Sequence, residues 1–211
     1  MMNYLEKKKK AMLNYVSGIT PPIPSEYQQV EYIDTNNQAI TQDDLVYNNS
    51  HTFRYELDCQ FNAQAISKYQ GIDAGCAISA TSGGYHNGSG TITISGSPLD
   101  RNLISLNATS GTTYYTIYNN GTQIGSGSRG NSSLATYSGG NGYPIGFRSR
   151  SNISASNIKV YGLKIYIDDV LERDYIPCYR KADNKVGLYD IVGNNFITTI
   201  NNYEFLKGGD V

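Results

Sequence analysis

The chain has 211 residues, of which 17% are charged, and its formal net charge is −1. A surface that binds nucleic acid needs an excess of Lys and Arg, so this balance argues against nucleic acid as the main partner. No segment approaches the ~18 consecutive apolar residues of a membrane helix, so we expect no membrane partner.

The N-terminal segment, residues 1–17, is compatible with a short helix. Its apolar residues Leu5, Met12, Leu13 and Val16 fall close to one helical face, with a run of lysines partly opposite. Such a short helix is marginal alone in water, so it needs a partner surface. We predict that it docks or oligomerises, on its own subunits or on other subunits of a particle; the alternative is a frayed tail.

Residues 18–24 form a Pro-rich linker that contains Pro21, Pro22 and Pro24. Closely spaced prolines cannot continue a helix and favour an extended, stiff segment. The N-terminus lacks the apolar stretch of a signal peptide, so we expect no export by the general secretory route. An extracellular role then requires another way out of the cell, such as assembly into a particle.

From residue 25 to residue 211 the apolar pattern changes to a period of two, which is typical of strands with one buried face. In Phe53–Phe61 every odd position is apolar and every even position is polar. Gly- and Asn-rich turns, such as Asn119-Asn120-Gly121, separate the candidate strands. Many short strands at regular spacing predict one all-β sandwich or barrel domain. The predicted strands are Tyr27–Ile33, Phe53–Phe61, Gly71–Ala80, Thr91–Ser95, Leu103–Asn107, Thr112–Tyr118, Tyr143–Arg148, Ile158–Ile167, Val170–Tyr175, Val186–Asp190 and Phe196–Thr199.

Both ends of this domain carry recognisable motifs. They are PSEYQQVEYIDT at Pro24–Thr35, KVYGLKIY at Lys159–Tyr166, RDYIPCYR at Arg173–Arg180 and VGLYD at Val186–Asp190. As a set they resemble the laminin-G-like (concanavalin A-like) jelly-roll domains of phage and prophage structural proteins of gut bacteria. The resemblance implies a two-sheet antiparallel jelly-roll sandwich. It also implies a virion appendage, tail or head-fibre component, or a surface adhesin.

The strand Phe53–Phe61 invites comparison with jelly-roll glycoside hydrolases, which carry three carboxyl groups at alternate positions of one strand. Here those positions hold Glu56, Asp58 and Gln60. An amide can neither protonate a leaving group nor activate water, so we expect no hydrolase of this type. The two histidines, His51 and His86, lie in no recognisable nucleophile motif, and we expect His86 in an exposed Gly/Ser-rich loop. We therefore predict a protein that is not an enzyme.

Glycan recognition uses an aromatic ring beside amide and hydroxyl groups. Two Tyr- and Asn-containing stretches have that composition, although Tyr can equally supply core and surface in a Trp-free β protein. The candidate glycan-binding residues are Tyr85, His86, Asn87, Tyr137, Asn141 and Tyr143.

No metal or cofactor is predicted, although calcium is the ion that this fold most often tolerates. Its candidate ligands are Asp43-Asp44, Asp73 and Asp168-Asp169. Adjacent Asp pairs are more often solvated turns, and none of these has the spacing of a calcium-binding loop. The three cysteines, Cys59, Cys76 and Cys178, form no CxxC pair, and we expect three free thiols.

Two functions remain. The first is a virion component, a homo-oligomer whose N-terminal segment docks on self or other virion subunits while the sandwich serves for attachment, with cell-surface glycan as a candidate ligand. The alternative is a stand-alone lectin or adhesin, located outside the cell or on its surface.

Overall fold

The computed structural model describes residues 23–36, 51–61, 67–70, 77–81, 84–87, 90–92, 100–109, 114–128, 158–199 and 204–211. These residues form fifteen strands and no helix, so none of them belongs to a helix long and apolar enough to cross a membrane. The predicted helix with Leu5, Met12, Leu13 and Val16 lies outside the described residues, as do residues 18–22 of the predicted linker.

Within the described ranges every strand pair is antiparallel, and the hydrogen bonds join eleven strands into one sheet and four into another. The all-β antiparallel prediction is confirmed for the described residues, while the jelly-roll arrangement stays a prediction. The larger sheet contains β1 (Tyr27–Gln29), β2 (Ile33–Asp34), β3 (Phe53–Phe61), β8 (Asn102–Ala108), β9 (Tyr114–Asn119), β10 (Thr122–Ser128), β11 (Ile158–Ile167), β12 (Val170–Arg180), β13 (Lys185–Asp190), β14 (Asn195–Ile197) and β15 (Leu206–Lys207). The smaller sheet contains β4 (Ser67–Gln70), β5 (Ala77–Thr81), β6 (Gly84–Asn87) and β7 (Gly90–Ile92).

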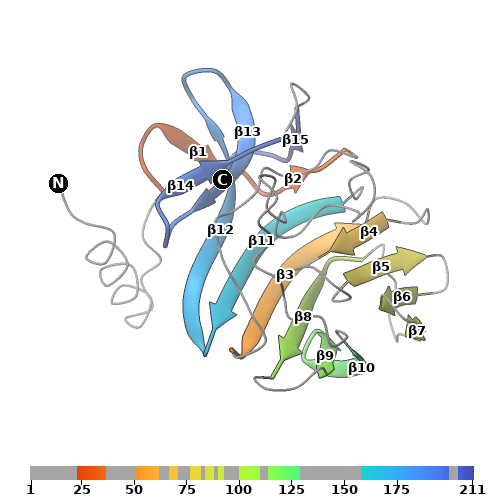
Figure 1. Ribbon diagram of the computed structural model, residues 1–211. Coiled ribbons are helices and arrows are strands. Elements are labelled where there is room, and N and C mark those ends of the chain that lie inside the picture. The colour runs from red at the N-terminus through yellow and green to blue at the C-terminus, as the bar shows by residue number, and fades with distance from the viewer. Residues whose placement is uncertain are drawn as a thin grey trace, which may run out of the picture.

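The centre of the larger sheet is β3, which pairs with β8 on one side and β11 on the other. Figure 1 shows β8, β3, β11 and β12 as long curved strands that run side by side. The odd residues of β3 from Tyr55 to Phe61 are buried, and the even residues from Arg54 to Gln60 are only half-buried. The core therefore lies on one face of this sheet, which leaves the opposite face, here called the outer face, for polar side chains.

The N-terminal motif, Pro24–Thr35, lies between the C-terminal motifs Lys159–Tyr166 and Arg173–Arg180. The strands β11 and β12 pair only where residues 163–167 face residues 170–175. Beyond that point, β2 pairs with the start of β11 at Val160, and β1 pairs with the end of β12. Val30 and Ile33 from this inserted segment are fully buried in the core. The motifs that carry the family resemblance thus form one packed unit, although more than a hundred residues separate them in sequence.

The last residues of the chain complete this unit. The strand β15 pairs with β2, and a further bridge joins Asp210 to Val30. Backbone hydrogen bonds run from Glu31 N to the Gly209 carbonyl at 2.9 Å and from Val211 N to the Gln29 carbonyl at 3.1 Å. The segment 204–211 is therefore held along the first strands of the domain.

Two hairpin turns have left-handed residues at both central positions. The β9–β10 turn contains Asn120 at φ 48° and Gly121 at φ 81°, which fits the predicted Asn-Gly signal. The β11–β12 turn contains Asp168 at φ 50° and Asp169 at φ 60°. Asp tolerates this region better than most residues, so an Asp-Asp pair can occupy both central positions of this turn.

Several strand boundaries differ from the prediction. The predicted strand Tyr27–Ile33 is divided into β1 and β2, because its two halves pair with different partners. The strand β12 continues to Arg180 instead of ending at Tyr175, and it passes through Pro177. A proline lacks the N–H that a central strand normally donates, so Pro177 is an unusual residue within a strand that has neighbours on both sides. The predicted strand Tyr143–Arg148 lies outside the described residues.

Candidate functional site

The candidate site is the outer face of β3 and its neighbours. The alternation along β3 places Arg54, Glu56, Asp58 and Gln60 on this face, as the sequence predicts, and all four side chains are half-buried. Each of them contacts a partner from another position, and the contacts form two clusters.

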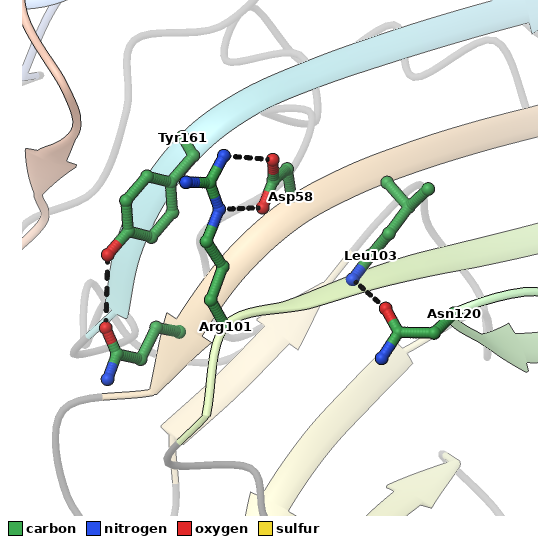
Figure 2. A network of polar contacts seen from close by, with 6 residues as sticks. Asp58, Arg101, Leu103, Asn120 and Tyr161 are labelled. Atoms are coloured by element: carbon green, nitrogen blue, oxygen red, sulfur yellow. Dashed lines mark hydrogen bonds and ion pairs between the residues drawn. The ribbon is translucent and has the colours of Figure 1, made fainter.

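The first cluster, here called the Asp58 cluster, contains Asp58, Arg101, Tyr161 and Gln60. Arg101 donates two parallel hydrogen bonds to the Asp58 carboxylate, from Nε at 2.9 Å and from Nη2 at 2.7 Å (Figure 2). The guanidinium carbon lies 3.9 Å from the centre of the Tyr161 ring, and the Tyr161 hydroxyl donates to Oε1 of Gln60 at 3.1 Å. One charged pair, one ring and one amide are thus fixed in a single arrangement.

Arg101 stays charged and Tyr161 stays neutral at neutral pH. The hydrogen bonds that Arg101 donates to the Asp58 carboxylate raise the pKa of Arg101 above its already high value. Burial raises the pKa of Tyr161, so its phenol stays protonated and continues to donate to Gln60.

The ring of Tyr161 is supported by a second ring from the N-terminal motif. The Tyr32 ring lies 5.4 Å from it at an angle of 58°, and Lys159 Nζ lies 4.6 Å from the centre of Tyr32. A methyl group at Gly208 would approach the Tyr32 ring to 2.8 Å, so the C-terminal segment passes close against this ring. The C-terminal segment therefore covers part of the Tyr32 ring, which in turn packs on Tyr161.

The second cluster, here called the Arg54 cluster, contains Arg54, Glu56 and Tyr166. Arg54 forms an ion pair with Glu56, and its guanidinium carbon lies 3.7 Å from the centre of the Tyr166 ring. The Tyr166 hydroxyl donates to Glu56 Oε2 at 3.4 Å. The Arg54 cluster repeats the chemistry of the Asp58 cluster, because an arginine again pairs with a carboxylate of β3 and stacks on a tyrosine of β11.

A cross-strand row extends from Glu56 towards β12. The register places Glu56 opposite Lys164, and Lys164 opposite Asp174. Burial raises the pKa of Asp174, the nearby Lys164 ammonium opposes that rise, and Glu56 adds to it. A lysine thus lies between the two carboxyl groups, which favours an ionic ladder over an acid and base that share a substrate.

One exposed apolar side chain lies beside the Asp58 cluster. Leu103 is directly opposite Asp58 in the β3–β8 register, and it is 41% exposed. The turn residue Asn120 makes two hydrogen bonds to the backbone of Leu103. Leu103 N donates to Asn120 Oδ1 at 2.8 Å (Figure 2). Asn120 N donates to the Leu103 carbonyl at 2.9 Å. Asn120 Nδ2 also donates to Asn102 Oδ1 at 3.1 Å. The outer face therefore presents an apolar group in a fixed position next to a charged pair.

The residues predicted for glycan binding are only partly within the described structure. Tyr85, His86 and Asn87 form part of strand β6, which pairs with β5 and β7. The expectation of a loop at His86 was wrong, because Gly84–Asn87 forms strand β6 of the smaller sheet. The other predicted glycan-binding residues, Tyr137, Asn141 and Tyr143, lie outside the described residues.

Of the possible calcium ligands, only Asp168 and Asp169 are described. Asp168 accepts a hydrogen bond from Thr52 N at 2.9 Å, and its Oδ2 lies 2.7 Å from His51 Nδ1. The contact with His51 lowers the pKa of the Asp168 carboxyl. The described ranges contain no group of three or more His, Cys, Asp and Glu residues that could hold a metal ion. Asp168 thus ties the β11–β12 turn to the residues before β3.

The thiol prediction is confirmed for two cysteines. Cys59 and Cys178 are free and buried. Burial raises the pKa of both thiols, that of Cys178 to about 12. Cys76 lies outside the described residues.

Sequence reasoning placed Glu56, Asp58 and Gln60 on one face of β3 but predicted no binding site there, and it missed their partners. Alternation in β3 was the signal for Glu56, Asp58 and Gln60. Arg101 is separated from Asp58 by 43 positions, and Tyr161 from Gln60 by 101. The partners depend on the pairing of distant strands, which no local pattern reports.

Comparison with protein-family models, with curated proteins and with solved structures found no match.

Proposed function

We propose that this protein is a non-enzymatic structural or appendage protein of a virion, of the tail or head-fibre type, and that its domain serves for attachment. In this proposal the strands form a laminin-G-like jelly roll of two sheets. The virion assignment is supported by the resemblance of the terminal motifs, which the fold brings together around β11 and β12.

The observation that supports a non-enzymatic function is that the polar side chains on the outer face of β3 already have partners within the protein. Glu56 pairs with Arg54, Asp58 pairs with Arg101, and the third position holds the amide Gln60. A retaining hydrolase needs a nucleophile and an acid/base group at the ends of such a row. A row of neutralised pairs and an amide suits hydrogen bonding to a ligand better than proton transfer.

A stand-alone lectin or adhesin is the second candidate. The observation that favours it is the Asp58 cluster, in which a rigid polar pair lies beside the exposed Leu103. Such a surface can bind a ligand without any particle.

The experiment that separates the two is mass photometry of the full-length protein. The virion proposal predicts oligomers that the double substitution Leu13→Asp with Val16→Asp dissociates, because the charges fall on the apolar face of residues 1–17. Asn14→Asp adds charge in the same segment and should leave oligomers intact. A full-length monomer that binds glycans would favour the lectin instead.

A further inference from the structure

We propose that Asp58 and Arg101 form the centre of a subsite for a neutral saccharide, in which the pair binds two neighbouring hydroxyl groups. This inference rests on the proposed attachment function and assigns its ligand chemistry. It places the ligand on the outer face of β3 and β8, at residues other than those that composition alone favours.

The pair has hydrogen-bonding capacity to spare on a solvent-accessible surface. The two hydrogen bonds to Asp58 use two of the five N–H donors of the Arg101 guanidinium. Each carboxylate oxygen accepts one of these bonds and keeps a second acceptor position. The Arg101 side chain is 54% exposed and the Asp58 side chain is 31% exposed. One hydroxyl of a diol can therefore accept from Arg101 while its neighbour donates to Asp58.

The pair is already rigid before any ligand arrives. The Tyr161 ring supports the face of the guanidinium, and Asp58 fixes its edge. Ordering flexible side chains is one of the main costs of binding, and this stack reduces it. A lysine at position 101 would keep the charge but lose both the paired hydrogen bonds to Asp58 and the stacking on the Tyr161 ring.

Leu103 supplies the apolar contact that a sugar ring requires. Side chains directly opposite each other in an antiparallel pair have Cβ atoms about 4.5–5.5 Å apart, so Leu103 and Asp58 are direct neighbours. The C–H groups of a sugar can pack on Leu103 while the hydroxyls of the same ring reach the charged pair. Asn120 fixes the backbone of Leu103 through two hydrogen bonds.

The local charge balance indicates a neutral ligand. Asp58 and Arg101 neutralise each other, so the subsite offers no excess positive charge to an acidic sugar. A ligand carboxylate would also meet the Asp58 carboxylate, which disfavours uronic and sialic acids.

The chain contains a matched control pair. Arg180 and Asp183 form the same two hydrogen bonds, from Nε at 3.0 Å and from Nη2 at 2.6 Å, and their side chains are 39% and 46% exposed. Arg180 is the last residue of β12 and Asp183 lies in the turn that follows, and the Arg180 guanidinium carbon lies 5.6 Å from the centre of the Phe196 ring. Arg180→Lys therefore tests the effect of losing a paired arginine–carboxylate contact at a surface position outside the subsite.

The test uses the full-length protein on an array of neutral oligosaccharides, ending in glucose, galactose, mannose or N-acetylhexosamines, and of sialylated and uronic-acid oligosaccharides. The best neutral oligosaccharide is then titrated calorimetrically. We expect Arg101→Lys and Asp58→Asn each to weaken binding at least about tenfold, with Arg180→Lys unchanged. Leu103→Ser should also weaken binding, whereas Leu206→Ser, at another exposed leucine, should not.

Circular dichroism and thermal melting confirm that each variant is folded before it is compared. Binding of no glycan on the array, binding restricted to acidic glycans, or binding that Arg101→Lys and Asp58→Asn leave unchanged would each overturn the subsite. None of these results bears on the oligomers that the virion proposal predicts, so the subsite can be wrong while the virion proposal stands.

Discussion

Arg173 and Asp190 form an ion pair, with Nε and Oδ2 3.3 Å apart, in which both side chains are more than nine-tenths buried. The Asp190 carboxylate also accepts hydrogen bonds from the backbone N–H groups of Asp174, Val192 and Gly193, at 3.0, 3.0 and 2.8 Å. This one side chain therefore joins β12 to the turn that follows β13.

We predict that Asp190→Ala lowers the free energy of unfolding by about 3–5 kcal/mol, because it leaves the Arg173 charge buried without its carboxylate. Urea denaturation followed by circular dichroism measures the change. Asp183→Ala is the control, since this carboxylate is exposed and forms a surface ion pair, and it should change stability little. Equal stability of the two variants would contradict the prediction.

Gly187 in β13 has no room for a side chain. A Cβ at this position would lie 2.2 Å from the Ile197 carbonyl oxygen and 2.7 Å from the Phe196 ring. We predict that Gly187→Ala destabilises the fold by about 1–3 kcal/mol, because β14 has to shift. Gly162→Ala in β11 is the matched control, since its nearest neighbour, the Tyr175 carbonyl oxygen, would lie 3.8 Å away. Thermal melts in which both variants lose the same stability would contradict the prediction that a side chain at position 187 clashes with β14.

The buried thiols should be protected in the folded protein. Cys59 and Cys178 are 1% and 0% exposed, and burial raises the pKa of both, so neither forms the reactive thiolate at pH 8. In a Cys76→Ser background, we expect Ellman's reagent to modify neither thiol in the native state and both after unfolding in guanidinium. Fast modification of the native protein would show that one of these thiols is accessible.

Stability should fall in alkaline solution. The pKa of Cys178 rises from 9.0 to about 12, and that of Tyr189 rises from 10.0 to about 12, in both cases chiefly through burial. The unfolded chain therefore releases these protons at lower pH than the folded protein does. Their contribution to stability is complete below pH 9 and is lost as the pH rises from about 9 to about 12.

Urea denaturation at intervals between pH 8 and pH 11 measures this dependence. Cys178→Ala removes one of the groups and should make the decline shallower. It should not abolish the decline, because Tyr189 and Cys59 still titrate. If the free energy of unfolding of Cys178→Ala declined with pH as steeply as that of the unchanged protein, this thiol would have the same pKa in the folded and unfolded states.

The strands that sequence predicts best are those with a regular local pattern. The bounds Phe53–Phe61 and Ile158–Ile167 agree with β3 and β11 residue for residue, because apolar side chains recur at a period of two along much of each. The continuation of β12 through Pro177 was missed, because its support comes from two neighbouring strands rather than from its own residues. The Gly- and Ser-rich β10 was missed because its own residues show no apolar alternation, and its support comes from pairing with β9.

The candidate site shows the same limit at the level of side chains. Alternation places Asp58 and Gln60 on one face, and this much follows from the β3 sequence alone. Whether Asp58 meets an arginine, a tyrosine or water depends on the strand register, which is a tertiary property. Arg101 lies just before β8, where nothing in the surrounding Pro-Leu-Asp-Arg sequence indicates a charged partner.

The pairing of residues 204–211 with the first strands of the domain has a mechanical consequence. Gln29 and Val211 lie at the same end of this antiparallel pair, and the bonds continue inward to Tyr32 and Gly208. A load that pulls residue 23 away from residue 211 would open these bonds one after another, as a zipper opens, instead of stretching them together. The C-terminal segment would then peel away first, before the tension reached the longer pairing of β11 with β3.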